Sequence, residues 1–188
     1  FDYSSGQCQT LTSTAYWFNG CLNLEAISAW ENLHTQNVTN MSGMFGGCNS
    51  LGYVDLHGFD TRNVTDMSGM FQGCNFLDEL DLRSFNTAKV TNMEAMFLGC
   101  LELQTIYVGN GWTTAAVNAS DMMFMECERL VGGEGTQFNP DITDARYAHA
   151  DGGVDNPGYL TFDGEVNIDE PDPDGPRLML WRQVGGKE

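Results

Sequence analysis

The sequence predicts an α/β repeat protein, a right-handed solenoid of about four to five coils with a parallel β-sheet on one wall and short helical turns on the other. Three observations predict this fold class. A segment with the sequence VTDMSGMFQGC recurs at a fixed period, a leucine-rich segment follows each copy, and the final cysteine keeps its place in every copy. A fixed period of roughly 20 to 50 residues indicates coils that bury their apolar faces on one another.

The repeat is defined by three near-identical segments, which occupy residues 38–48, 64–74 and 90–100. The cysteines that end these segments are spaced by 26 residues. Weaker copies end 27 residues outside the regular set, at Cys21 and Cys127. The repeat therefore spans most of the chain.

Within each copy, apolar residues have the spacing of one face of a short helix. In the central copy these residues are Val64, Met67, Met70, Phe71 and Cys74. This spacing predicts a helical turn with one buried face, preceded by Thr65 as its N-cap. A stripe of methionine and phenylalanine could line a lipid or cofactor pocket, but its repetition in register favours a packed core wall.

A second pattern follows each cysteine, with apolar residues spaced as L-x-x-L-x-L. The best examples are Leu51, Val54 and Leu56, and then Leu77, Leu80 and Leu82. This spacing is that of the strand segment in leucine-rich repeats. Alternation along a strand directs these residues inward and the residues between them outward, so stacked coils would form a parallel sheet.

The order of these motifs resembles a known family. Residues 59–71 read FDTRNVTDMSGMF, and they are followed by Gly73, Cys74 and an LDEL segment that starts at Leu77. This combination closely resembles the BspA-like leucine-rich repeat of bacterial surface proteins, over residues 11 to 130, with departures at the edges where Thr14, Trp17 and Ser120 replace methionines. The resemblance implies a cell-surface or secreted module that binds a host or neighbouring-cell protein, as an adhesin does.

Six cysteines in an acidic chain could indicate a secreted disulfide scaffold. However, five of them share one repeat position, which favours a column of buried thiols, with pairing between adjacent coils as the alternative. Cys8 lies outside the column, so we expect it to be the exposed thiol. No Cys-x-x-Cys or His-x-x-x-His spacing occurs, and we therefore expect no metal and no cofactor.

The charge balance bears on the possible partners. There are 26 Asp and Glu residues against 8 Lys and Arg, a formal net charge of −18. Such a surface repels nucleic acids and anionic membranes. No apolar run approaches the roughly 18 to 20 residues of a membrane span. We expect no nucleic-acid partner and no direct membrane insertion. The chain begins in the middle of a repeat, which predicts that it is a fragment of a longer protein.

The pattern divides the chain into three parts. Residues 1–135 are expected to form the solenoid, with an irregular first coil, and residues 136–165 a C-terminal cap. Residues 166–188 are expected to form an acidic, proline-rich linker and the stub of a following segment. The apolar residues expected to cover the last coil are Tyr147, Tyr159, Leu160 and Phe162. A calcium loop in the acidic tract is the alternative to a linker, but the ligand spacing of an EF-hand is absent.

The candidate binding face is the outward side of the predicted sheet. Its residues are Trp30, Tyr53, Asp55, His57, Glu79, Asp81, Arg83 and Tyr107. Aromatic residues and arginine are enriched at protein interfaces. Neighbouring parallel strands are about 4.8 Å apart, so Asp55 and Asp81 would need a cation such as Arg83 beside them. The alternative is that Arg83 and His57 only neutralise their neighbours on a solvated sheet.

The repeat does not favour an enzyme. Catalysis needs a nucleophile, base or metal held at one place, whereas repeats distribute the same residue types along a wall, so we predict no catalytic residues. A hydrolytic pair of Asp55 and Asp81 has no sign of a cleft around it. We predict an adhesin-like protein-binding module that uses the sheet wall. The alternatives are a passive surface spacer or stalk and a glycan-binding accessory module, in which Trp30, Tyr53 and Tyr107 would contact the sugar.

Overall fold

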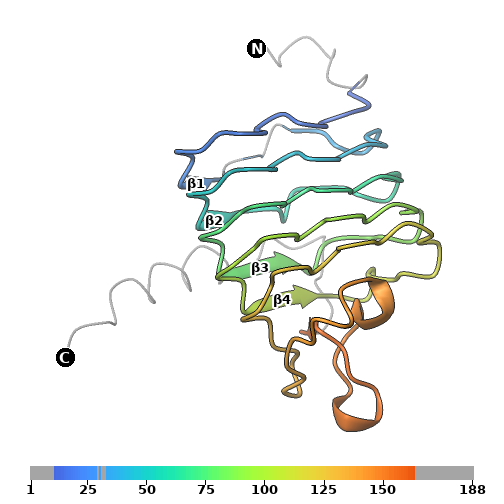
Figure 1. Cartoon of the computed structure of the whole chain (residues 1–188). Helices are drawn as coiled ribbons and strands as arrows, with labels where there is room; N and C mark the ends of the chain where they lie inside the picture. Colours follow the sequence, from blue (N-terminus) through green and yellow to red (C-terminus); the bar gives the residue numbers. More distant parts are fainter. Residues whose placement is uncertain (1–10, 29, 31–32, 164–188) are drawn as a thin grey trace.

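A computed structural model describes residues 11–28, 30 and 33–163 of the 188-residue chain. The backbone runs back and forth in loops of similar length that lie parallel to one another (Figure 1). Parallel β-bridges join one residue from each of five successive copies of the repeat, in the order Ser13, Asn40, Asp66, Asn92 and Ala119. The 26-residue period therefore places equivalent residues of successive copies side by side.

Five short strands form two small parallel sheets. The strands are β1 (Ala26–Ile27), β2 (Tyr53–Val54), β3 (Glu79–Leu82), β4 (Thr105–Val108) and β5 (Thr161–Phe162). One sheet has the order β1-β2 and the other the order β3-β4-β5. Two 3₁₀ turns, η3 (Ala145–Tyr147) and η4 (Gly153–Asp155), lie before β5. Among the described residues, there is no helix with the length and apolar character needed to cross a membrane.

The predicted fold class is wrong. The described residues contain no α-helix, so the helical turns expected on one wall are not formed. The strands make two small parallel sheets of two and three strands rather than the sheet wall of a solenoid. Most of the described chain is turn and coil, and the leucine-rich segments contribute at most four residues each to a strand.

The backbone hydrogen bonds show why the apolar stripe does not form a helix. In residues 41–48, the Met44 amide donates to Met41 within the same copy, but the Phe45 amide donates to Met70 in the next copy, 2.9 Å away. An α-helix would require each amide to donate four residues back along the chain. In addition, Gly43 and Gly47 have φ values of 57° and 72°. A left-handed residue at every fourth position interrupts a right-handed helix.

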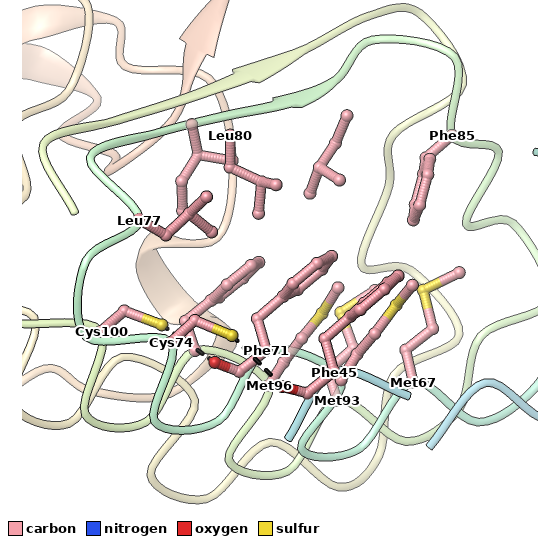
Figure 2. Close-up of a cluster of buried hydrophobic side chains, with 14 of the residues drawn as sticks. Phe45, Met67, Phe71, Cys74, Leu77, Leu80, Phe85, Met93, Met96 and Cys100 are labelled. Carbon is pink, nitrogen blue, oxygen red and sulfur yellow. Dashed lines mark hydrogen bonds between the residues drawn. The ribbon is translucent and has the colours of Figure 1, made fainter. Parts of the chain in front are cut away.

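The apolar stripe is nevertheless buried, as the sequence predicts. Phenylalanines from five copies stack in a ladder with centroid separations of 5.4–6.0 Å and interplanar angles of 3–16°; they are Phe18, Phe45, Phe71, Phe97 and Phe124. Figure 2 shows the rings of Phe45 and Phe71 lying one behind the other, with the side chains of Met67, Met93 and Met96 nearby. The Tyr159 ring packs edge-on against Phe124 and covers the end of the ladder, with centroids 5.2 Å apart.

The cysteines of the repeat form a second ladder. Cys48, Cys74, Cys100 and Cys127 are buried, whereas Cys21 in the first copy is exposed, and none of the five forms a disulfide. Each buried thiol donates to the carbonyl of the phenylalanine in the preceding copy, with Sγ···O distances of 3.1–3.3 Å. The alternative of paired neighbours is therefore wrong for the described cysteines. Burial raises the pKa of Cys74 and of Cys127 to about 12.

This burial predicts the pattern of thiol labelling. Cys8 lies outside the described residues, so the test uses a Cys8→Ser variant. Thiolates rather than thiols react with iodoacetamide, and burial blocks both ionisation and access. We expect the folded protein to be alkylated at Cys21 alone and the denatured protein at all five remaining cysteines, as measured by mass spectrometry. Rapid labelling of Cys74 in the folded protein would contradict the buried ladder.

Residues 131–163, which follow the last copy and which we call the covering segment, cover the end of the core. The Phe124 amide donates to the Thr143 carbonyl at 2.9 Å, which replaces the contact that a further copy would make. Tyr159 and Leu160 are fully buried, and Tyr147 packs against the core, as expected. Phe162, which was also expected to cover the core, is 52% exposed instead. The predicted domain boundaries stay a prediction, and residues 166–188 lie outside the described part of the chain.

Asp151 joins the start of this covering segment to the turn at Gly153. Its carboxylate accepts hydrogen bonds from the amides of Glu134, Thr136 and Gly153, each 2.9 Å long, and from the Thr136 hydroxyl at 2.7 Å. Burial raises the pKa of this carboxyl, but the hydrogen bonds outweigh burial and lower the pKa to about 2. Gly132 allows the backbone at Gly158 to approach it closely, because an added Cβ at residue 132 would lie 2.1 Å from the Gly158 carbonyl oxygen.

Candidate functional site

The strands bring most of the predicted binding residues together on one face. The register pairs Asp81 with Tyr107 and Glu79 with Thr105 between β3 and β4, and Tyr53 with Ala26 between β1 and β2. Along β3 and β4 the outward residues are half-buried and alternate with fully buried ones. We refer to the partly exposed residues Tyr53, Asp55, His57, Glu79, Asp81, Arg83 and Tyr107 as the sheet face.

Trp30 does not belong to the sheet face. Its indole ring packs edge-on between Phe18 and Phe59, with centroid distances of 5.8 and 5.4 Å. Trp30 thus contributes to the apolar core of the first copies rather than to an outward column. Of the three aromatic residues predicted for the binding face, only Tyr53 and Tyr107 therefore lie on the sheet face.

A chain of ionic contacts runs across the sheet face. The His57 ring lies between two carboxylates, with Nδ1 3.0 Å from Asp55 Oδ1 and Nε2 3.3 Å from Asp81 Oδ2. Asp81 also accepts from Arg83, whose Nη2 lies 2.6 Å from Asp81 Oδ2 and whose Nε is 3.0 Å from Oδ1. Arg83 Nη1 then donates to Asp163 Oδ2 at 3.0 Å. The chain of contacts links two copies of the repeat to the segment that follows β5.

One of these contacts agrees with an alternative drawn from the sequence, and the other was not predicted. The sequence left open that His57 and Arg83 neutralise their neighbours, and the structure places the His57 ring between Asp55 and Asp81, where it supplies the cation that the pair requires. Asp163 is 80 residues after Arg83 and was assigned to the covering segment. Its position follows from the pairing of β5 with β4, which matches Val108 with Phe162, the residue before Asp163. No spacing in the sequence indicates that pairing.

The ionic contacts shift the pKa values of the groups involved. Hydrogen bonds from His57 to Asp55 and Asp81 raise the pKa of His57 to about 10, so the ring is charged at neutral pH. The hydrogen bond from His57 lowers the pKa of Asp55. Burial raises the pKa of Asp81, but hydrogen bonds from His57 and Arg83 outweigh burial and hold that pKa well below its usual value. Burial and the two carboxylates raise the pKa of Tyr53.

These shifts predict a pH-dependent contribution of His57 to stability. Because the folded-state pKa is raised, the contribution is full below the unfolded pKa of 6.5 and is lost as the pH rises through about 10. We expect His57→Asn to lower the free energy of unfolding by about 1 to 2 kcal/mol near pH 6, a modest value because the side chains are partly exposed. The difference from the unsubstituted protein should shrink near pH 10, as measured by urea unfolding.

A matched control is His34→Asn, at an exposed position elsewhere in the chain. This change should leave the stability nearly the same at both pH values. Equal destabilisation by His57→Asn at pH 6 and pH 10 would show that the lost contribution is not ionic.

The basic side chains of the described residues are all engaged with acceptors. Arg62 pairs with Asp60, Arg83 with Asp81, Lys89 with Asn63, Arg129 with Glu102 and Arg146 with Asp144. The acidic side chains outnumber them, as they do in the whole chain. A partner would therefore meet a surface of net negative charge. Within the described residues, no group of three or more His, Cys, Asp or Glu side chains is placed to hold a metal ion.

Comparison with known proteins gives one result. Residues 12–144 match a family described as "Mycoplasma protein of unknown function, DUF285". The match starts at the first described copy of the repeat, includes every residue of the sheet face and ends within the covering segment. Comparisons with curated proteins and with solved structures gave no match.

Proposed function

From the premise that this chain belongs to the family described as "Mycoplasma protein of unknown function, DUF285", we propose that it is a protein-binding module that contacts a macromolecular partner through the sheet face. The observation that supports this proposal is the ionic chain from Asp55 through His57, Asp81 and Arg83 to Asp163. Preorganised side chains lose little entropy on binding, so a face held by its own contacts suits recognition.

The composition of the sheet face supports a protein as the partner. Tyr53 and Tyr107 lie beside the two aspartates, and tyrosine and arginine are among the residues that contribute most to binding energy at interfaces. Since the basic side chains are already engaged with acceptors, we expect the contacting surface of the partner to carry lysine and arginine. The resemblance to BspA-like repeats supports an adhesin-like role at the cell surface or in secretion, with a host or neighbouring-cell protein as the partner.

A binding screen tests this proposal. The purified chain is presented to extracellular proteins and to a glycan array, together with a Tyr53→Ala/Arg83→Ala variant. Loss of two such anchors should weaken binding by about tenfold or more. The matched control is Phe76→Ala, which removes an aromatic side chain that is 66% exposed and lies outside the sheet face.

The screen also separates the alternatives. If the double variant keeps the full affinity for every partner found, the sheet face is not the binding site. If the chain binds no protein and no glycan, a passive spacer or stalk is the better interpretation. Binding to a glycan that depends on Tyr53 and Tyr107 would favour the glycan-binding alternative, although Trp30 is partly buried against the core rather than placed on the sheet face.

A further inference from the structure

We propose that Asn110, in the turn after β4, is a site of spontaneous deamidation, and that the equivalent reaction at the chain's other Asn-Gly sequence, Asn19-Gly20, is suppressed by the fold. Both asparagines are exposed and both precede glycine. The two sites share the Asn-Gly dipeptide and differ in the hydrogen bonds that hold them. This proposal does not depend on the proposed function.

The reaction uses only the chain and water. The Gly111 backbone nitrogen attacks the side-chain carbonyl carbon of Asn110, a nitrogen–carbon bond forms, and the bond to Nδ2 breaks. Nδ2 leaves as ammonia, taking up the proton released by the Gly111 amide, and a five-membered succinimide remains. Water then opens the ring at one of its two carbonyl carbons, which yields aspartate or isoaspartate. A following glycine favours attack because it has no side chain to hinder the nitrogen.

The turn at Asn110 leaves the attacking nitrogen available. The Trp112 amide donates to the Gly109 carbonyl at 3.2 Å, so Asn110 and Gly111 are the two central residues of a β-turn. The closing hydrogen bond of such a turn does not involve the amide of the second central residue. Within the described residues, the Gly111 amide donates to no acceptor.

The site at Asn19 is held differently. The Gly20 amide donates to the Gly46 carbonyl of the next copy at 2.7 Å, and the Asn19 side-chain nitrogen donates to the Gly43 carbonyl at 3.4 Å. Attack on the Asn19 side chain requires both hydrogen bonds to break. If breaking these hydrogen bonds raises the activation free energy by about 1.4 kcal/mol, the reaction becomes tenfold slower. We expect Asn110 to react at least about tenfold faster than Asn19 in the folded protein.

Deamidation at Asn110 would affect the end of the core. The Gly111 carbonyl accepts the Thr87 amide at 3.0 Å, and the next residue, Trp112, donates from Nε1 to the Ala148 carbonyl at 2.9 Å. An isoaspartate adds a methylene group to the backbone of this turn. Gly111 has little room to adjust, because an added Cβ there would lie 2.5 Å from the Phe85 carbonyl oxygen. Amide hydrogen exchange at Thr87 should therefore become faster in the isoaspartate form.

Peptide mapping by mass spectrometry tests the proposal. The full chain is incubated at mildly alkaline pH, and deamidation at Asn110 and Asn19 is followed over time, with isoaspartate separated from aspartate by chromatography. The same measurement in guanidinium chloride is the control, because both Asn-Gly sequences should then react at similar rates. Faster conversion of Asn110 in the folded chain, with equal rates in the denatured chain, supports the proposal.

Two results would overturn it. One is a rate at Asn110 in the folded chain that does not exceed the rate at Asn19. The other is the same ratio of rates in the folded and denatured chains, which would assign the difference to sequence rather than to structure. An Asn110→Gln variant, whose longer side chain disfavours a five-membered ring, serves as the negative control and should gain no isoaspartate at this turn.

Discussion

Phe71→Ala is expected to lower the free energy of unfolding by about 3 to 5 kcal/mol, the usual cost of removing a fully buried phenylalanine. Phe71 is completely buried at the centre of the phenylalanine ladder, with the Phe45 ring 5.6 Å away on one side and the Phe97 ring 6.0 Å away on the other. The substitution leaves a cavity between two rings that the backbone hydrogen bonds of the adjacent copies hold in place. Urea unfolding followed by circular dichroism measures the effect.

Phe76→Ala provides the matched control, since Phe76 is five residues further along the same copy and 66% exposed. Its removal should change the free energy of unfolding by no more than about 0.5 kcal/mol. Similar losses at Phe71 and Phe76 would contradict the buried ladder. So would a Phe71→Ala variant as stable as the unsubstituted protein.

Thr61→Val is expected to lower the free energy of unfolding by about 2 to 3 kcal/mol, because it removes a hydroxyl without changing the shape of the side chain. Thr61 is buried, and its Oγ1 donates to the Asn86 carbonyl at 3.0 Å and accepts from the Asn86 amide at 2.8 Å. Valine would leave both backbone groups without this partner. Thr35 and Thr87 make the same pair of contacts with the following copy, so the hydroxyls form a polar ladder between copies.

Two variants isolate the role of this hydroxyl. Thr61→Ser keeps the hydroxyl and should recover most of the lost stability. Thr65→Val removes an exposed hydroxyl that donates to the Thr39 carbonyl at 3.1 Å, and should cost less than about 1 kcal/mol. A Thr61→Val variant no less stable than Thr65→Val would show that the buried ladder contributes little.

The sequence predicted the columns of residues better than it predicted the backbone. The pairing of Asp81 with Tyr107 and the burial of Met70, Phe71 and Cys74 follow from the 26-residue period, and the structure confirms them. The helical turns were wrong because apolar residues three and four positions apart are typical of a helix, but successive tight turns give the same spacing. Only the partners of the amides distinguish a helix from successive tight turns, and about half of those partners lie 25 or 26 residues further along the chain.

The sheet face was also predicted in part. The period indicated that Asp55 and Asp81 would lie close together and would need a cation, and His57 and Arg83 are both in contact with Asp81. Trp30 was misplaced because its indole ring fills core space between Phe18 and Phe59 instead of lying on the outward face. Such a choice depends on the space left by other copies, which the local pattern does not describe.

The sequence by itself determined which residues of this protein are equivalent and which of them are apolar, because repetition and hydrophobicity are properties of the chain that need no coordinates. Only the tertiary structure decided how the backbone satisfies its amides, which ring lies between Asp55 and Asp81, and that Asp163 meets Arg83. These features depend on contacts between residues far apart in the chain, and their energies come from three-dimensional geometry rather than from local preference.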